Sequence, residues 1–213
     1  MTVQEIITAV AKENGINPAL MLTMARIESN FNPNAVNRSS RATGLFQFLP
    51  MHFESGGYGL TPGNVKDPRI NSQAAAKMIK NNIKCLEGKG IKVMEDWQVY
   101  LAHQQGCGGA SALLSRRGQP LSALPSNIQR NVRANIGNRS VSTVDEFLNL
   151  WKQKFDGFYA QYSTGSNSSS NIAEEKPKPT TLTPAPPLKT DYLASGLLTF
   201  ATILAVSTII IYS

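Results

Sequence analysis

Apolar side chains recur at the spacing of an α-helix over most of the first 162 residues. Thr2 and Glu5 form a capping-box pattern ahead of the first such stretch, and Gly15 ends it. Further helices are predicted over Ala19–Glu28, Pro68–Leu86 and Asp96–Gln104, with a last one from Thr143 to Tyr162. Alternating, strand-like patterns are scarce. The fold class is therefore expected to be mostly α.

A hydrophobic pattern of a different kind lies near the other end of the chain. The 21 residues from Tyr192 to Tyr212 carry no charge and are rich in Leu, Ile, Ala, Val and Thr. As a helix rising about 1.5 Å per residue, this run would cover roughly 30 Å, the thickness of a bilayer's hydrocarbon core. A buried core helix is the alternative, but little sequence is left to pack around it. Residues 191–213 are therefore predicted to form one C-terminal transmembrane helix.

Residues 163–190 have the composition of a disordered linker. Ser, Asn, Gly and Thr are followed by a stretch with five prolines between Pro177 and Pro187, which favours extended backbone. The chain is thus expected to consist of a globular domain at 1–162, this linker, and the membrane helix at 191–213. The first residues lack the basic and apolar regions of a secretory signal peptide, so export by a cleaved signal is not expected.

The formal charge of +7 lies in the globular part, where 18 Lys and Arg face 11 Asp and Glu. A basic domain suggests a polyanionic partner, such as nucleic acid, an acidic lipid surface or the bacterial cell wall. Specific binding of nucleic acid is disfavoured, because the basic residues are scattered and no motif interleaves them with aromatic side chains.

The few cysteines and histidines do not indicate metal or disulfide chemistry. Cys85 and Cys107 are too few for a disulfide framework, and we expect them to be unpaired thiols. They do not stand at metal-ligand spacing with His52 and His103, which are the only histidines. No zinc site, and no other metal site, is therefore predicted.

Glu28 stands out among the carboxylates because of its position on a helix face. It follows Met24 by one turn and Leu20 by two, so it shares the face that these apolar residues turn toward the core. Burial beside apolar side chains raises the pKa of a carboxylic acid, which would leave Glu28 able to donate a proton near neutral pH. A solvent-facing glutamate in a frayed last turn is the alternative, and position alone does not decide between them.

Four short segments, in order along the chain, resemble the soluble lytic transglycosylases, which are relatives of goose-type lysozyme. They are the Glu28-Ser29 pair, the Gly-Leu-Phe-Gln-Phe segment at 44–48, the Asp-Pro-Arg-Ile-Asn segment at 67–71 and the segment at 100–106. The resemblance covers about Ile16 to Leu114 and implies a lysozyme-like, SLT-type helical domain. It says little about residues 115–162.

The segment at 100–106 departs from the usual form of the family, which is Ala-Tyr-Asn-Ala-Gly. His103 stands in place of the tyrosine, and Gln104 stands in place of the asparagine. The resulting His-Gln-Gln-Gly sequence resembles virion-associated phage members of the family. By this resemblance, both side chains should line the substrate cleft.

The resemblance implies an enzyme that cleaves peptidoglycan glycan strands with one acid/base residue and no cofactor. Glu28 would protonate the oxygen of the β-1,4 bond between N-acetylmuramic acid (MurNAc) and N-acetylglucosamine (GlcNAc). It would then accept the proton of the muramyl C6 hydroxyl, giving a 1,6-anhydromuramyl end. A hydrolytic glycosidase usually needs a second carboxylate. Glu54 and Asp67 lie in Gly- and Pro-rich loops, however, and are predicted to be solvated turn residues.

The same resemblance suggests which side chains bind the substrate. The positions are Ser29, Phe46, Gln47, Phe48, His103 and Gln104. Ser29 would help to hold the catalytic carboxylate, and the two glutamines would hydrogen-bond sugar groups. One of the two phenylalanines would pack against the apolar face of a sugar ring.

The domain organisation and the His-Gln-Gln-Gly variant together predict a membrane-anchored enzyme of a bacteriophage virion. It would open the host's periplasmic cell wall locally during genome entry. Its expected partners are glycan strands, a membrane through the C-terminal helix and other virion proteins. A bacterial or plasmid-encoded wall-remodelling enzyme of a secretion or conjugation apparatus is one alternative. A non-catalytic structural protein of a membrane or virion is another.

Overall fold

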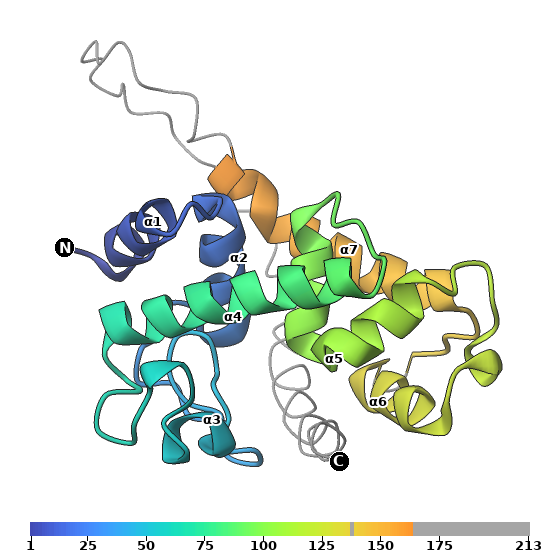
Figure 1. Cartoon of the computed structure of the whole chain (residues 1–213), viewed down its shortest axis with the longest axis horizontal. Helices are drawn as coiled ribbons and strands as arrows, with labels where there is room; N and C mark the ends of the chain where they lie inside the picture. The colour runs from blue at the N-terminus through green and yellow to red at the C-terminus, as the bar shows by residue number, and fades with distance from the viewer. Residues whose placement is uncertain (137–138, 164–213) are drawn as a thin grey trace, which may run out of the picture.

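The computed structural model describes residues 1–136 and 139–163, and these form a helical domain (Figure 1). The α-helices are α1 (Val3–Glu13), α2 (Pro18–Ser29), α3 (Pro50–Glu54), α4 (Pro68–Gly88), α5 (Asp96–Leu114), α6 (Ser126–Ile136) and α7 (Val144–Ser163), with 3-10 turns η1 (Gly57–Gly59) and η2 (Leu121–Ala123). Within the described residues, β-structure is limited to isolated bridges, such as Val36 with Thr43 and Thr43 with Phe48. The prediction of a mostly α domain is confirmed.

Helix α4 is the central element of the arrangement. It runs across the view in Figure 1 and packs against α1 and α5, while η1 lies beneath it. Helix α7 packs against both α2 and α5. Elements far apart in the sequence therefore meet around α2 and α5.

Local sequence explains where most helices begin. Thr2 and Glu5 form the predicted capping box, with the Glu5 backbone N–H donating to the Thr2 hydroxyl. Helix α2 begins with Pro18 after the Asn17 cap, and α4 begins after Asp67, whose carboxylate accepts from the Ile70 N–H at 2.8 Å. The expected helices at these places are confirmed, with ends shifted by one or two residues.

Three helical features differ from the sequence predictions. Helix α5 does not stop near Gln104 but bends at Gly106 (φ 67°, ψ 161°) and continues to Leu114. The glycine there supplies a backbone angle that other residues rarely adopt, so it acts as a bend rather than an end. Helices α3 and α6 were not predicted at all.

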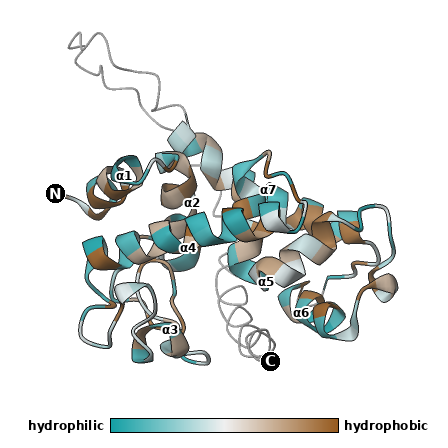
Figure 2. Cartoon of the chain, viewed as in Figure 1, coloured by the Kyte–Doolittle hydropathy of each residue, from teal (hydrophilic) through white to brown (hydrophobic). Residues whose placement is uncertain are grey.

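The core is continuous through the domain, and amphipathic helices enclose it. In Figure 2, α1 and α4 change between apolar and polar colour along the ribbon, as helices with one buried face do. The largest fully buried side chains come from all parts of the fold and include Ile7, Met24, Phe46, Ile79, Tyr100 and Phe147. Burial of this apolar surface is the main force that holds the helices together.

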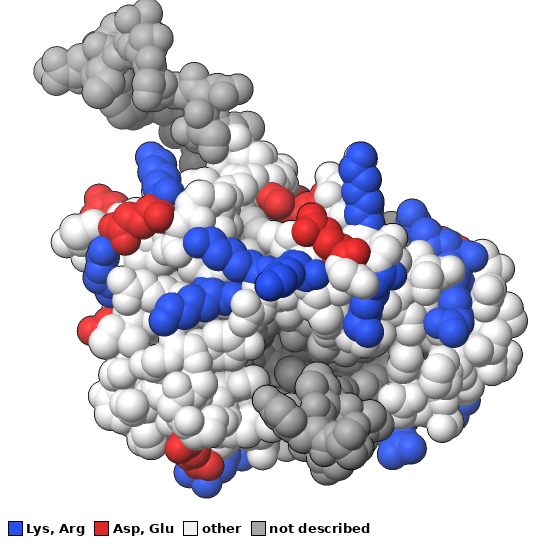
Figure 3. All heavy atoms as spheres, viewed as in Figure 1, with Lys and Arg blue, Asp and Glu red and all other residues white. Residues whose placement is uncertain are grey.

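Exposed positive charge lies along helix α4. Figure 3 shows Lys and Arg side chains spread across the face on which α4 lies. Lys77, Lys80 and Lys84 are exposed along that helix at spacings of three and four residues. The excess positive charge inferred from composition is therefore partly concentrated in a stripe, which suits a polyanionic neighbour such as the cell wall.

Cys85 and Cys107 are joined by a disulfide, so the expectation of two unpaired thiols is wrong. The bond links α4 to the part of α5 that follows the Gly106 bend. Sequence spacing could not show this pairing, because it depends on the packing of α4 against α5. One such bond does not make a disulfide framework, but it fixes two of the core helices to each other.

The predicted linker and C-terminal membrane helix lie outside the described residues, apart from Ser163, which ends α7. None of the helices within residues 1–136 and 139–163 has the length and apolar character needed to cross a bilayer. The division into a domain, a linker and a membrane segment therefore stays a prediction.

Candidate active site

Glu28 lies in the last turn of α2, on the face that packs into the core. Leu20 and Met24 on the same face are 2% and 0% exposed, as the helical spacing predicted. The Glu28 side chain itself is only 8% exposed. The alternative of a solvent-facing, frayed glutamate is therefore excluded.

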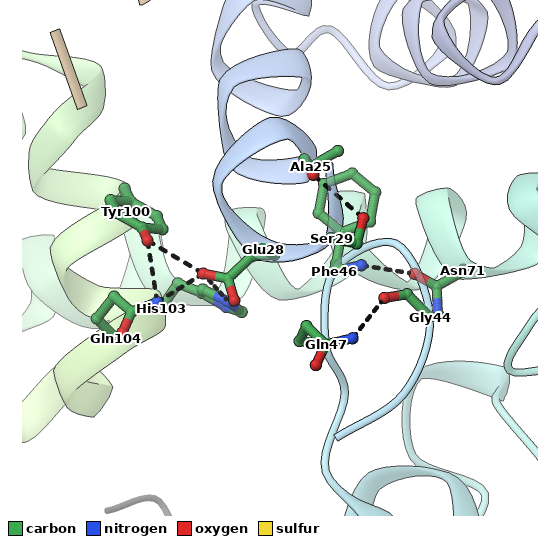
Figure 4. A network of polar contacts seen from close by, with 10 residues as sticks. All are labelled: Ala25, Glu28, Ser29, Gly44, Phe46, Gln47, Asn71, Tyr100, His103 and Gln104. Atoms are coloured by element: carbon green, nitrogen blue, oxygen red, sulfur yellow. Dashed lines mark hydrogen bonds and ion pairs between the residues drawn. The ribbon is translucent and has the colours of Figure 1, made fainter. Parts of the chain in front are cut away.

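Three side chains of α5 surround one carboxylate oxygen of Glu28 (Figure 4). The Tyr100 hydroxyl donates to Oε1 at 3.1 Å, and the Gln104 amide donates to the same atom at 2.6 Å. His103 Nε2 lies 3.5 Å from Oε1. The three positions share one face because they are separated by three and four residues. Gln104 also contacts the Tyr100 hydroxyl at 3.1 Å, which makes the group a connected network.

The pKa of Glu28 is lower than that of an ordinary glutamate, which corrects the expectation of a raised value. Burial is the largest single influence and raises the pKa of this carboxyl group. It is outweighed by the hydrogen bond and charge of His103, the charge of Lys154 and the hydrogen bond from Tyr100. The helical pattern predicted the burial correctly, but it could not reveal these partners.

The same surroundings keep Tyr100 protonated. Burial and the neighbouring charge of Glu28 raise the pKa of the Tyr100 phenol well above its usual range. The hydroxyl therefore keeps its proton near neutral pH and donates to the Glu28 carboxylate.

Helix α7 packs against the Tyr100 side of this network. The rings of Trp151 and Phe155 lie 5.9 and 5.7 Å from the ring of Tyr100. Lys154, on the same helix, lies with its Nζ 5.0 Å from the centre of the Trp151 ring. Burial lowers the pKa of this lysine to about 8, while the charge of Glu28 acts in the opposite direction. The C-terminal part of the domain thus contributes to the electrostatics of the site.

The loop at 43–49 lies on the other side of Glu28 in Figure 4. Its Gly44 has φ 87°, and a Cβ at this position would clash with the Asn71 amide and the Val65 carbonyl. Asn71 is fully buried, accepts from the Phe46 N–H at 3.0 Å and donates to the Val65 carbonyl at 2.6 Å. The glycine is therefore required by the close approach of this asparagine.

The predicted substrate-binding residues of this loop have different surroundings. Gln47 is partly exposed, and its amide donates to the Gly44 carbonyl at 2.9 Å. Phe46 and Phe48 are 0% and 2% exposed. Both rings belong to the core and present no free face to a sugar, so the structure contradicts the stacking role suggested for them.

Ser29 does not hold the carboxylate of Glu28 as expected. Its hydroxyl donates to the Ala25 carbonyl at 3.1 Å, within the same helix. Hydroxyls of serine commonly form this bond one turn back along a helix, because the carbonyl is the nearest acceptor. Ser29 therefore supports the end of α2 rather than the carboxylate directly.

No second carboxylate accompanies Glu28 among the residues that the structure describes. Asp67 caps α4, Glu54 is exposed, and Glu5 and Glu146 belong to helix-capping boxes. Ion pairs or hydrogen bonds engage Glu13, Glu95, Asp96, Asp145 and Asp156, and Glu87 is exposed. None of these carboxylates is among the groups that contact Glu28 or shift its pKa, so Glu28 is the one acid/base candidate that the described contacts identify.

The sequence predicted that Glu28, His103 and Gln104 belong to one site, but it did not identify Tyr100 or Lys154 as parts of that site. Tyr100 precedes Gln104 by four residues, so helical spacing could have placed both on one face. No local signal points to Lys154, because it reaches the site only through the packing of α7 against α2 and α5.

Comparison with protein families gives one match that bears on this site. The model of the transglycosylase SLT domain matches residues 5–120, which is more than half of the 213-residue chain. The matched range contains Glu28, the loop at 43–49 and all of α5, whereas α7 lies outside it. The chain therefore belongs to the family of SLT-domain transglycosylases and is a peptidoglycan lytic transglycosylase, a lyase acting on polysaccharide.

Proposed function

We propose that Glu28 is the only acid and base of this enzyme and that the bond it cleaves is the β-1,4 bond between MurNAc and GlcNAc. The observation that carries this proposal is a buried carboxylate with three polar partners from α5, while no other carboxylate of the described residues is among the groups that contact it or shift its pKa. A hydrolase of the inverting or retaining type would need that second group.

The chemistry balances with Glu28 alone. Protonated Glu28 gives its proton to the glycosidic oxygen as the bond from this oxygen to the muramyl C1 breaks. The C6 hydroxyl oxygen of the same muramyl residue then bonds to C1, and its proton passes to the Glu28 carboxylate. The products are a free GlcNAc hydroxyl and a 1,6-anhydromuramyl end. Because the nucleophile is part of the substrate, it is already held close to the reacting carbon.

The remaining predicted residues differ in their contacts, and their proposed roles differ accordingly. Gln47 lies across from Glu28 in Figure 4 and is the strongest candidate for hydrogen bonding to sugar groups. Gln104 and His103 contact Glu28 itself, so their main effect falls on the carboxylate. Direct binding of sugar by these two residues stays a prediction.

The experiment that tests the acid/base role is a digest of purified peptidoglycan by the full chain and its E28Q variant. We expect the wild type to release muropeptides lighter by one water than hydrolytic products, as mass spectrometry would show, and E28Q to release none. Gln keeps the shape of the side chain but cannot exchange a proton. E54Q, at an exposed position, is the matched control and should match the wild type. Products with reducing ends would contradict the proposal.

We further propose that the enzyme is carried in a bacteriophage virion and opens the host's periplasmic wall locally during genome entry. The His-Gln-Gln-Gly sequence at 103–106 supports a virion-associated protein, and the uncharged run at 192–212 supports a membrane tether. The Pro-rich linker would give the domain reach. The disulfide fits work in an oxidising compartment such as the periplasm.

Immunodetection in purified particles tests this setting. The virion proposal predicts that the protein copurifies with particles through a density gradient and remains after they are washed. Recovery only in the envelope of uninfected cells would instead favour a wall-remodelling enzyme of a secretion or conjugation apparatus.

A further inference from the structure

Three aromatic rings lie together where the loop at 43–49 leads into α3 and the turn η1. The ring centres of Phe48 and His52 are 6.0 Å apart, and those of Phe48 and Tyr58 are 5.9 Å apart. The rings of His52 and Tyr58 lie 5.7 Å from each other. Phe48 is buried, whereas His52 and Tyr58 are each partly exposed. Two aromatic residues with surface open to solvent are therefore backed by a core side chain.

Tyr58 has a backbone conformation that glycine usually occupies. Its φ is 59° and its ψ is 10°, and it is flanked by Gly56 with φ 73° and Gly59 with φ 83°. A bulky residue adopts this left-handed conformation at an energetic cost, and strain of this kind is concentrated at functional sites. Glycine would fit here without that cost. We therefore expect the tyrosine ring to contribute something that a fourth glycine in this turn could not.

Contacts with α3 and α4 fix the turn that carries Tyr58. Gly57 lies so close to α3 that a Cβ at this position would come within 2.8 Å of the His52 carbonyl oxygen. From α4, the Lys77 ammonium donates to the Tyr58 carbonyl at 3.4 Å. The Tyr58 ring is thus positioned in the free protein, which reduces the entropy lost when a ligand packs against it.

The aromatic cluster adjoins the active site on the side of the loop at 43–49. This loop lies across from Glu28 (Figure 4) and continues directly into α3. The pKa of His52 is lowered mainly by burial and also by the charge of His103, which lies on α5. His52 is therefore near enough to the α5 side of the site to sense that charge. A glycan strand that passes Glu28 and follows this loop would reach Tyr58.

We propose that Tyr58, together with His52, binds a sugar ring of the glycan strand at a position removed from the bond that is cleaved. The inference rests on the proposed function, since it takes the strand held at Glu28 as the ligand. A pyranose ring presents C–H groups that pack against the electron-rich face of an aromatic ring. The buried rings of Phe46 and Phe48 cannot offer such a face. Strands long enough to reach Tyr58 should therefore bind more tightly than shorter ones.

Calorimetric titration with strands of increasing length tests the proposal without reference to catalysis. The parent protein is full-length E28Q, and the probe is peptide-free glycan strands separated by length. The affinity of the parent should rise at the length that reaches Tyr58. Y58L keeps apolar bulk in the cluster but has no aromatic face. It should lose this rise and bind the longer strands about 3- to 10-fold more weakly, the range expected for one aromatic contact.

Two controls and a second variant separate binding from folding. Y58F keeps the ring without the hydroxyl and should bind like the parent. Y162L replaces a partly exposed tyrosine whose ring packs against Phe31, and it should leave the affinity unchanged. Y58N is the second variant if Y58L does not fold, because asparagine adopts the left-handed conformation more readily than leucine. It should show the same loss of affinity for the longer strands.

The outcomes distinguish this proposal from the one on which it rests. Equal affinities of the parent and the ring-less variant for the longer strands would overturn it. A loss of the same size at every strand length would also overturn it, because the contact would then not lie at a remote position. Cleavage by E28Q would instead overturn the proposed acid/base role. The ratio of kcat/KM for long and short strands, measured with the wild type and Y58L, would then decide the role of Tyr58.

Discussion

At the scale of single residues, the Tyr100 hydroxyl is a partner of the catalytic carboxylate that one conservative substitution removes. It donates to Glu28 and lies in a fully buried position. A hydrogen bond to a charged group contributes about 1.5 to 3 kcal/mol, so Y100F should lower kcat roughly 10- to 100-fold with little change in KM. Initial rates of muropeptide release by the wild type and Y100F measure this.

The matched control for Y100F is Y159F. The Tyr159 hydroxyl also serves a polar network, donating to Asp96 at 2.8 Å and accepting from Asn17 at 2.7 Å, but it does not touch Glu28. Its loss should reduce stability by about 1 kcal/mol and leave kcat near the wild-type value. Equal rate losses in both variants would mean that Tyr100 acts through stability alone.

The sequence revealed the catalytic glutamate but not the state of its carboxyl group. Spacing from Leu20 and Met24 predicted the buried face of α2 correctly. The sign of the pKa shift depends on Tyr100 and His103, which lie more than 70 residues away along the chain. Such partners come from tertiary packing and leave no trace in the local pattern around Glu28. The two phenylalanines of the loop at 43–49 were misassigned for a similar reason, since a motif does not say which of its side chains are buried.

At the scale of elements, the loop at 43–49 should tolerate change least at Gly44. A Cβ there would displace the buried Asn71 amide, and an alanine at φ 87° is strained in addition. G44A should therefore lower the free energy of unfolding by about 2 to 4 kcal/mol. It should also lower activity, because the loop forms one side of the site. Urea unfolding followed by circular dichroism measures the first effect.

Gly88 offers a matched glycine for comparison. It ends α4, and a Cβ there would meet nothing within 4 Å. Alanine is favoured over glycine within helices by up to about 1 kcal/mol, so G88A should be neutral or slightly stabilising. A G44A protein as stable as G88A would show that the loop can rearrange around the extra carbon.

Helices with a regular apolar stripe and a clear cap were predictable, and shorter or mixed ones were not. Helix α7 followed from its aromatic stripe and the pairing of Thr143 with Glu146. Helix α6 buries only Ile128, Asn131 and Val132 and is mostly polar, so its composition resembles that of a polar loop. The helix predicted at α5 ended too early, because a glycine such as Gly106 often marks the end of a helix. Its bend is tolerated because the helix on both sides packs into the core.

At the scale of the whole molecule, the family match ends before α7, although α7 contributes to the active site. Residues 5–120 carry the family pattern, yet the rings of α7 pack behind Tyr100 and Lys154 contributes charge to Glu28. A fragment ending near residue 120 would leave Tyr100 without this support. The catalytic unit therefore includes α7, which lies beyond the end of the family match.

The disulfide is the feature of the whole domain that sequence reasoning misjudged, and it has a measurable consequence. Cys85 and Cys107 close a loop of 22 residues, and in the chain-entropy account such a bond stabilises the folded state by about 3 kcal/mol. Adding reductant should therefore lower Tm by roughly 6 to 12 °C, as measured by thermal unfolding of the full chain. The C85S/C107S double variant should unfold at the lower temperature whether or not reductant is present. Because α5 carries both Cys107 and the partners of Glu28, reduction should lower activity as well as Tm. If reductant changed neither the Tm nor the activity of the wild type, the packing of α4 against α5 would hold the site without the bond.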